Sequence, residues 1–484
     1  VGGNQAANDL SNSGAVFVFR RSAGVWVQEA YLKASNPDAN DFFGQAVAID
    51  GDTLVVGAPG EDSSATGIGG GQLDNATTNS GAVYVFTRSG TTWSQAEYVK
   101  APAIDTFDDF GSSVGISGDT LVVGAPLEDG GAMGVGGDPA DNGASGSGAT
   151  YVYREVGGVW SFEAYVKASN TDMGDRFGSR VTIDGDLLAA GAPFEKSAAQ
   201  GIDGNQGDDT GNVNGAAYLF ERTGTTWAQV AYLKGSNTES LDEFGGSLCL
   251  SGETLVVGAA GESAQSFGVN GNQADNKMTD AGAAYVFERQ AGVWSQRAYL
   301  KPAYPNALDT FGRSVALDGS SLVVSAPLEA SEATGVDGNQ TLNGSYQTGA
   351  AFAFDLAAPC GSIRYGDYDA VNSADIYSFD QPTSPSPIKL RLSGFRNAGT
   401  ALVALSPAPA SVPGFLGGTL LLDLATFSPS SLFLTPIANG SGQLNLNVPP
   451  GAGGAVVYLQ AAMVDATKPG GWAFTTGLEL SVCP

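Results

Sequence analysis

The sequence predicts an all-β protein in which four-stranded sheets are repeated in a β-propeller and followed by a small all-β domain. A unit of 67 residues recurs five times without drift, as the interval from Phe43 to Phe110 shows. Each unit contains four short strand-like runs separated by turn residues, and no segment has the 3.6-residue apolar period of a helix. Radial closure of such sheets leaves few exposed edges, which favours a propeller.

In the first complete unit, the four expected strands follow one another with short turns. The first covers residues 43–49 and the second covers 53–59, joined by the tight turn Asp50-Gly51. A long loop rich in Gly, Asn and Asp leads to a third strand at 81–88, and a Ser-Gly-Thr-Thr turn leads to a fourth at 93–101. The unit therefore predicts one antiparallel blade.

The repeat keeps several residues at fixed positions. A Phe-Gly pair begins the first strand and a Trp begins the fourth, which indicates packing between and around blades. A Lys ends the fourth strand, an Asp stands two residues before Phe-Gly, and a Glu follows the second strand. These polar positions are Lys33, Lys100, Lys167, Lys234 and Lys301; Asp41, Asp108, Asp175, Asp242 and Asp309; and Glu61, Glu128, Glu195, Glu262 and Glu329.

The repeated motifs FGQAVAIDGDTLVVGAP, FGSSVGISGDTLVVGAP and FGRSVALDGSSLVVSAP resemble the FG-GAP repeats of integrin alpha-subunit propellers and their bacterial relatives. The resemblance covers residues 1–356 and implies six or seven four-stranded blades. Residues 1–19 align without gaps to 68–86, so the chain begins inside a repeat, and its last repeat ends after a third strand. We therefore expect residues upstream of Val1, or a neighbouring chain, to complete the ring.

Residues 357–484 are predicted to form a separate β-sandwich-like domain, because the repeat stops and Pro, Ser, Leu and Ala become frequent. Cys360 and Cys483 stand at the two ends of this segment, as a closing disulfide would. Such a bridge predicts an oxidising compartment. Cys249 lies in an apolar strand and is expected to be a buried free thiol.

The composition excludes several functions. The chain has 50 Asp and Glu against 22 Lys and Arg, a net charge of −28, which repels nucleic acid and anionic membranes. There is no histidine, which removes the usual general base and zinc ligand. No apolar run reaches the roughly 20 residues that a transmembrane helix requires. We expect no enzyme activity, since a catalytic site should be singular and these acids repeat in every unit; a carboxylate-based hydrolase is the remaining enzymatic alternative.

Strand direction places the repeated Lys, Asp and Glu on the same face as the long loops, which we call the upper face. In integrins the corresponding face binds ligands. We interpret the polar set as blade architecture that satisfies loop amides and buried charge. The alternative is a pair of carboxylates in each blade that holds a cation.

The long loops alternate side-chain oxygens with glycine, as oxygen-ligand calcium sites do. Loops folded on their own amides as Asx turns are the alternative. Integrin calcium loops lie between the first and second strands, where this chain has only the Asp50-Gly51-Asp52 turn, so that site cannot be carried over. The candidate calcium ligands are Asp203, Asn205, Asp208, Asn270, Asn272, Asp275, Asp337 and Asn339.

The resemblance and the composition together predict a secreted or cell-surface binding or adhesion protein. Its upper face would engage a protein or glycan, with calcium as the only candidate cofactor. A structural subunit of an extracellular matrix or filament, which pairs with copies of itself through strands or faces, is the alternative.

Overall fold

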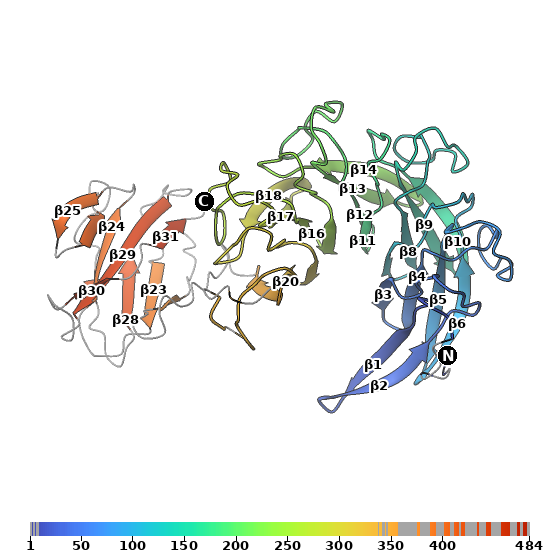
Figure 1. Cartoon of the computed structure of the whole chain (residues 1–484), viewed down its shortest axis with the longest axis horizontal. Helices are drawn as coiled ribbons and strands as arrows, with labels where there is room; N and C mark the ends of the chain where they lie inside the picture. The colour runs from blue at the N-terminus through green and yellow to red at the C-terminus, as the bar shows by residue number, and fades with distance from the viewer. Residues whose placement is uncertain are drawn as a thin grey trace. The chain divides into compact units, whose positions relative to one another are not determined.

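A computed structural model describes residues 2, 5, 9–336, 338–340, 344 and 347–356, together with the backbone of short strands between 375 and 481 (Figure 1). The chain divides into two compact units. The first consists of 1–319, 323–330 and 345–352 and contains nearly all of the repeat array, and the second contains the remaining residues. All regular structure within the described residues is β-strand and turn, with no helix that could cross a membrane.

The repeat array consists of antiparallel sheets in which neighbours in sequence are neighbours in space. It begins with a two-stranded hairpin and ends with a three-stranded sheet. The hairpin is β1 (Val16–Ser22) and β2 (Val25–Leu32). The four-stranded sheets are β3 (Ala46–Asp50), β4 (Thr53–Ala58), β5 (Ala82–Ser89) and β6 (Thr92–Val99); β7 (Ser113–Ser117), β8 (Thr120–Ala125), β9 (Ala149–Val156) and β10 (Val159–Val166); β11 (Arg180–Asp184), β12 (Leu187–Ala192), β13 (Ala216–Thr223) and β14 (Thr226–Leu233); and β15 (Ser247–Ser251), β16 (Thr254–Ala259), β17 (Ala283–Gln290) and β18 (Val293–Leu300). The last sheet is β19 (Val315–Asp318), β20 (Ser321–Ala326) and β21 (Ala350–Asp355).

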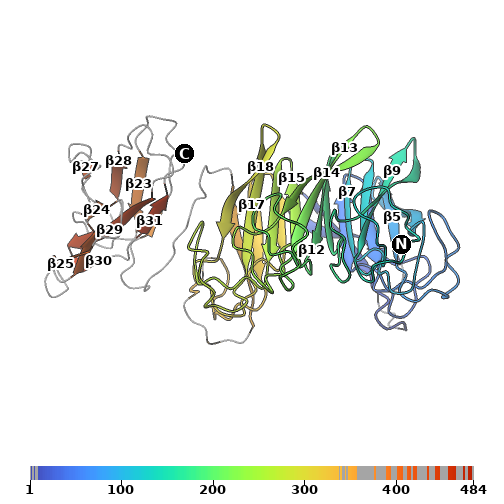
Figure 2. The same ribbon diagram turned by 90° about the horizontal axis from the view of Figure 1, so that it is seen from above.

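The sheets are the blades of a propeller. The first strands of successive sheets, β3, β7, β11, β15 and β19, contact one another in that order, so each sheet has its first strand innermost (Figures 1 and 2). The predicted four-stranded unit is confirmed in four sheets, and β19–β21 makes a fifth blade of three strands. The hairpin β1–β2 corresponds to the outer half of a blade. A total of six or seven blades stays a prediction.

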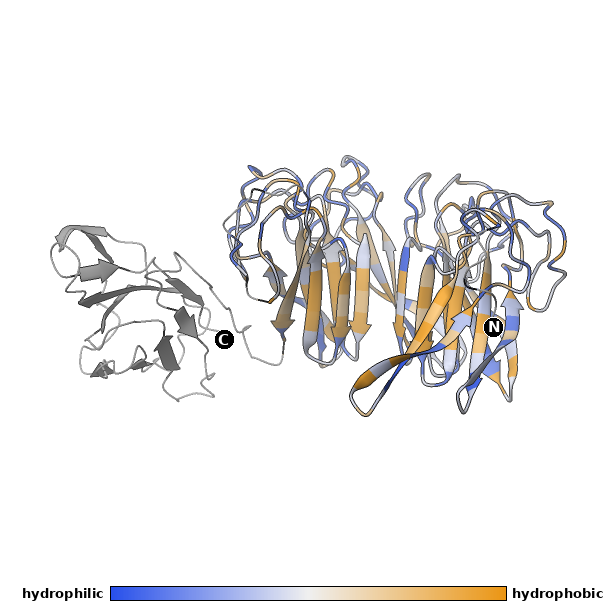
Figure 3. Ribbon diagram, turned by 60° about the horizontal axis from the view of Figure 1, so that its bottom comes forward, coloured by the Kyte–Doolittle hydropathy of each residue, from blue (hydrophilic) through white to orange (hydrophobic). Residues whose placement is uncertain are grey.

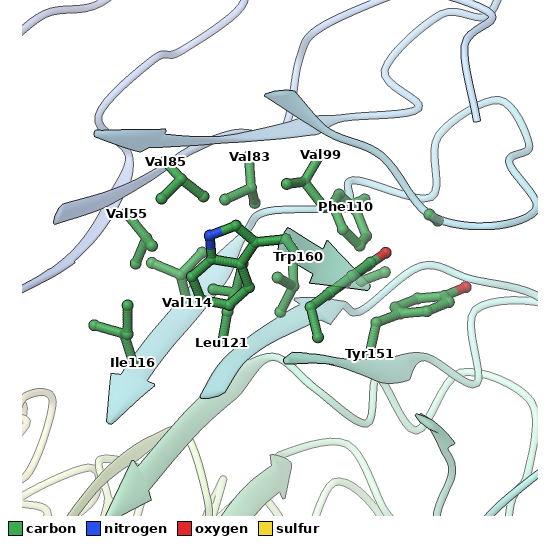
Figure 4. Close-up of a cluster of buried hydrophobic side chains, with 14 of the residues drawn as sticks. Val55, Val83, Val85, Val99, Phe110, Val114, Ile116, Leu121, Tyr151 and Trp160 are labelled. Carbon is green, nitrogen blue, oxygen red and sulfur yellow. The ribbon is translucent and has the colours of Figure 1, made fainter. Parts of the chain in front are cut away.

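The blades between the two ends of the array are covered on both faces by their neighbours, which explains the continuous apolar runs such as Thr-Leu-Val-Val-Gly-Ala in β4, β8 and β16. Figure 4 shows one junction, in which Val55, Val83 and Val85 of one blade face Ile116 and Trp160 of the next. Figure 3 shows the same segregation over the whole array, with apolar strands and polar loops.

The two glycines of the repeat meet at each junction. A Cβ on Gly57, at the end of β4, would lie 2.0 Å from the carbonyl oxygen of Gly111, which follows Phe110 at the start of the next blade. Gly111 itself has a φ of +94°, which favours glycine. The Gly of one motif is therefore required because the Phe-Gly backbone of the next blade packs directly on it. The same approach recurs between Gly124 and Gly178.

The second compact unit contains short antiparallel strands. One sheet has the order β22 (Asp375–Tyr377), β23 (Ile388–Ser393), β28 (Gly442–Leu446) and β27 (Phe433–Leu434); another joins β24 (Ala401–Ser406), β29 (Val456–Val464), β30 (Trp472–Phe474) and β31 (Leu478–Ser481); β25 (Ser411–Phe415) pairs with β26 (Gly418–Leu421). The expected all-β character is confirmed, whereas the β-sandwich stays a prediction. Cys360 and Cys483 lie outside the described residues. Cys249 in β15 is a free thiol that is partly rather than fully buried.

Candidate functional site

Two sets of loops leave the blades at the same end and form the upper face (Figure 3). The connector loops join the outermost strand of one blade to the innermost strand of the next, and the long loops join the second and third strands of a blade. The connector loops are 33–45, 100–112, 167–179, 234–246 and 301–314, and the long loops are 59–81, 126–148, 193–215, 260–282 and 327–349. At the opposite end the strands are joined by tight turns, such as Gly51-Asp52.

The repeated Lys and Glu form buried ion pairs inside single blades. The Nζ of Lys100 lies 2.8 Å from Oε2 of Glu61, and both side chains are at most 2 % exposed. Burial lowers the pKa of Lys100, and the facing carboxylate acts in the opposite direction. The pair joins the end of the outermost strand to the start of the long loop. The equivalent distances are 2.8 Å for Lys167–Glu128, 2.7 Å for Lys234–Glu195 and 2.6 Å for Lys301–Glu262.

Further hydrogen bonds satisfy the rest of each pair. Lys100 also donates to the hydroxyl of Ser80 at 2.7 Å, and Asn36 donates to Oε1 of Glu61 at 2.9 Å. The hydroxyl of Tyr84 donates to the amide oxygen of Asn36 at 2.6 Å. Because both oxygens of the glutamate already accept bonds, the arrangement is that of a structural network. The same network contains Asn170, Tyr218 and Glu195 in the third blade and Asn237, Tyr285 and Glu262 in the fourth.

The hairpin and the second blade depart from this network in different ways. In the hairpin no second strand supplies a glutamate, and Lys33 donates instead to the hydroxyl of Ser13 at 2.7 Å and to the carbonyl of Gly14. In the second blade the asparagine is replaced by Ala103. In the other blades this asparagine accepts a hydrogen bond from a tyrosine hydroxyl. The corresponding hydroxyl in the second blade, that of Tyr151, is fully buried and has no hydrogen-bond partner. Tyr151 is thus an orphaned donor in an otherwise repeated polar core.

The repeated Asp caps a turn in each connector loop. Oδ2 of Asp41 accepts the backbone N–H of Asp38 at 2.7 Å, and Asp242 accepts that of Glu239 at the same distance. Burial raises the pKa of these carboxyls, with the nearby glutamate of the long loop adding to the effect. The pKa is about 6 for Asp41 and Asp309, about 7 for Asp108 and Asp175, and about 8 for Asp242.

The residues on either side of each capping Asp have left-handed backbone conformations. In the second blade Phe107 has a φ of 70° and Asp109 a φ of 55°. Their N–H groups donate to the carbonyls of Thr78 and Asn79, at the end of the preceding long loop, at 2.9 and 3.0 Å. Hydrogen bonds between blades therefore fix this backbone. The equivalent residues are Asn40 and Phe42, Gly174 and Arg176, Leu241 and Glu243, and Leu308 and Thr310, all with positive φ.

The side chains at these positions are exposed and differ from blade to blade. Phe107, Leu241 and Leu308 are 55 %, 54 % and 56 % exposed, although a bulky residue in this conformation is strained. The aligned position holds Asn40 in the first blade and Gly174 in the third. Sequence reasoning did not find this set. The sequence does contain an indication of it: the repeat aligns a Phe and two Leu with a Gly and an Asn, the residue types that favour a left-handed backbone.

The candidate calcium ligands lie in the long loops, where their side-chain oxygens accept backbone hydrogen bonds. Asp203 accepts the N–H of Tyr232 at 2.9 Å, and Asn270 accepts that of Tyr299 at the same distance. Oδ1 of Asn205, Asp208, Asn272 and Asp275 accepts N–H groups of nearby loop residues. Asp337 lies outside the described residues, and Asn339 belongs to the last long loop. Across the described ranges, no three His, Cys, Asp or Glu side chains are grouped closely enough to hold a metal ion.

The charge of the chain is concentrated on the upper face. Besides the buried pairs, the connector and long loops carry many carboxylates and few cations. By contrast, several arginines lie near the opposite end and have acidic partners there, as Arg88 has in Asp52. The upper-face carboxylates outside the repeated set include Asp38, Asp62, Asp74, Asp105, Asp109, Asp129, Asp138, Asp141, Asp172, Asp203, Asp208, Asp209, Glu239, Glu243, Asp275 and Asp280.

A family model described as FG-GAP repeat matches residues 26–86, 93–153, 160–220, 227–287 and 294–354. Each matched stretch runs from the outermost strand of one blade through the first three strands of the next. No curated protein matches the chain.

Proposed function

The chain belongs to the FG-GAP repeat family, and from that premise we propose that it is a non-enzymatic binding protein that engages a partner protein through its upper face. The fold is one that is commonly used for binding, while the chemistry of the upper face belongs to this chain. The observation that carries the proposal is the set of connector loops. Their backbone is the same in every blade, and their exposed side chains are not.

A constant backbone with variable side chains is what a recognition surface requires. Asn40 and Gly174 occupy the position of Phe107, Leu241 and Leu308 in other blades, so the fold of a blade does not require an apolar side chain there. Their strained conformation costs stability, on the order of 1–3 kcal/mol for each residue. Exposed apolar side chains held at such a cost support a role in contacting a partner.

The partner's chemistry follows from the surroundings of these apolar residues. They stand among the many carboxylates of the connector and long loops, so the face is both apolar and acidic. A protein segment with apolar side chains flanked by Lys and Arg is complementary to it. A glycan would gain little from aliphatic Leu241 and Leu308, so we favour a protein.

The repeated carboxylates support the absence of catalysis. Those of the Lys–Glu pairs and the capping Asp are buried and already engaged in structural hydrogen bonds. A carboxylate-based hydrolase would need one pair that differs from the others in an accessible pocket. A catalytic role is therefore the weaker proposal.

The test uses the full chain and immobilised peptides of three kinds: basic–apolar, acidic–apolar and glycine–serine. Binding of basic–apolar peptides that weakens with salt is expected. A triple variant, F107G, L241G and L308G, should bind at least about tenfold more weakly. Val293→Gly, which removes an exposed apolar side chain outside the upper face, is the control. Equal binding by the triple variant, or binding to a glycan array alone, would contradict the proposal.

We also carry forward two finer proposals. Calcium would bind to the long loops that contain Asp203, Asn205 and Asp208, and it should then raise the melting temperature relative to a chelated sample. Secretion to an oxidising compartment would accompany a bridge between Cys360 and Cys483. Thiol alkylation before and after reduction counts the free cysteines and tests that bridge directly.

A further inference from the structure

The second blade lacks a polar link that the other three four-stranded blades share. In the first blade the hydroxyl of Ser35 donates to the amide oxygen of Gln72, and Nδ2 of Asn36 donates to the main-chain carbonyl of Gln72 at 3.0 Å. The amide of Gln95, in β6, donates to the same serine at 3.1 Å. These bonds tie the connector loop to the long loop and to the outermost strand. The equivalent residues are Ser169, Asn170, Gln206 and Gln229 in the third blade and Ser236, Asn237, Gln273 and Gln296 in the fourth.

In the second blade all four of these polar residues are replaced by apolar ones. Pro102 stands in place of the serine and Ala103 in place of the asparagine; Pro139 and Phe162 stand in place of the two glutamines. Phe162 is 41 % exposed, and the other three residues are partly exposed. Because the same four positions lie in contact in the other blades, these residues form one surface, which we call the second-blade patch.

The orphaned hydroxyl of Tyr151 belongs to this place in the blade. In the first blade the equivalent hydroxyl, that of Tyr84, donates to the amide oxygen of Asn36 at 2.6 Å. Figure 4 shows Tyr151 at the margin of the apolar cluster, with its hydroxyl directed away from Val55 and Ile116. A buried hydroxyl without a partner costs free energy, so an acceptor supplied at Ala103 would be favourable.

The acceptors that the asparagine uses in the other blades also have counterparts here. They are Oε1 of Glu128 and the main-chain carbonyl of Pro139. Oε1 of Glu128 accepts the hydroxyl of Tyr165 at 2.7 Å and has capacity for a second donor. Oε1 of Glu195 shows this, since it accepts both the asparagine and the tyrosine of the third blade, at 2.9 and 3.0 Å. One donor and two acceptors therefore occupy the positions that hold a carboxamide group in the other blades.

We propose that the second-blade patch binds the carboxamide side chain of an Asn or Gln residue of the partner protein. The amide oxygen accepts the hydroxyl of Tyr151, and the amide nitrogen donates to Glu128 and to the carbonyl of Pro139. Apolar neighbours of that residue pack on Pro102 and Phe162. The inference rests on the proposed function and names a residue that the partner supplies.

The position is reached from solvent, because the asparagine is partly exposed in each of the other three blades and Ala103 is partly exposed in the second. Other side chains fit the site less well. An Asp or Glu of the partner would place a second oxygen against the carboxylate of Glu128, and a Leu would leave Tyr151 without an acceptor. The chemistry of the site therefore selects a carboxamide over its charged and apolar isosteres.

The first experiment tests the site without any partner. Propionamide, a carboxamide of the size of a Gln side chain, is added to the full chain and observed by saturation-transfer difference NMR, with propionate as the charged isostere. A signal is expected for propionamide and not for propionate. Ala103→Asn, which supplies the chain's own amide, should abolish it, and Asn170→Ala should increase it by opening an equivalent site in the third blade. Ala291→Asn, at an exposed alanine in the β17–β18 turn, is the matched control. Equal signals from wild type and Ala103→Asn overturn the inference.

The second experiment uses immobilised basic–apolar peptides with a central Gln, Glu or Leu. The Gln peptide should bind the full chain at least about tenfold more tightly than the other two, and Ala103→Asn should remove that preference. Equal binding of the three peptides overturns this inference and leaves the binding function of the upper face intact. A propionamide signal without binding of any peptide supports the carboxamide site and contradicts the proposed function.

Discussion

The ammonium of Lys100 and the carboxylate of Glu61 lie 2.8 Å apart in the interior of one blade, where neither side chain reaches solvent. The pair links the last strand of the blade to the loop that follows its second strand. It is repeated in three further blades, and the first lysine of the series, Lys33, stands outside it. That difference provides a test within one chain.

Replacing Lys100 by Met should lower the free energy of unfolding by about 3–5 kcal/mol, because it leaves a buried carboxylate without its partner. The same change at Lys33 should cost much less, since no glutamate faces that residue. Denaturant titration of both variants measures the difference. Equal losses at the two positions would show that the ion pair is not what stabilises the blade.

The orphaned hydroxyl of Tyr151 predicts a stabilising substitution. Ala103→Asn should place an amide oxygen where Asn36 accepts Tyr84 in the first blade, and it should stabilise the protein by about 1 kcal/mol. Tyr151→Phe removes the orphaned donor, so the gain from Ala103→Asn should vanish in that background. A double-mutant cycle of melting temperatures measures this coupling. An additive result would mean that the asparagine does not reach the tyrosine.

The capping Asp residues predict a dependence of stability on pH. Burial raises the pKa of Asp242 to about 8, well above that of an unfolded chain. The folded protein therefore holds this proton more tightly, so the stabilisation is complete below about pH 4 and is lost as pH rises towards 8. Asp242→Asn keeps an oxygen that can accept the N–H of Glu239 and removes the titration. Melting temperatures from pH 4 to 9 should fall less steeply in the variant; an unchanged slope would refute the assignment.

The paired glycines predict a local steric limit. Gly124→Ala places a Cβ about 2.0 Å from the carbonyl oxygen of Gly178, which the next blade can relieve only by moving. We expect a loss of about 1–3 kcal/mol or failure to fold. Gly71→Ala is the matched control, since nothing lies within 4 Å of its added Cβ. Thermal unfolding and soluble yield distinguish the two variants.

The sequence alone predicted the blades because their determinants are local and repeated. The Asp50-Gly51 turn, the strand that follows it and the fixed position of Phe43 each specify part of the same sheet. The repeat period also indicated which Lys, Asp and Glu share a face. It did not indicate that Glu61 pairs with Lys100 of its own blade rather than with Lys33, because strand order and not sequence separation decides which lysine lies nearer.

The connector loops were missed for a physical reason. A left-handed conformation is normally indicated by Gly or Asn, and Gly174 and Asn40 are consistent with it. Phe107 and Leu241 give no such indication, because their backbone conformation is fixed by the hydrogen bonds that their N–H groups donate to carbonyls of the preceding long loop. Where a neighbouring blade fixes the backbone conformation of a residue, the intrinsic propensity of that residue does not predict the conformation.

The most direct test of this account is the stability of Phe107→Gly. If the side chain serves recognition, glycine relieves the strained φ and offsets its own entropy cost, so the free energy of unfolding should change by less than about 1 kcal/mol. Phe110→Ala, three residues away and fully buried, should cost about 3–5 kcal/mol. A loss of similar size in Phe107→Gly would show that Phe107 supports the fold, and would contradict its assignment to the recognition surface.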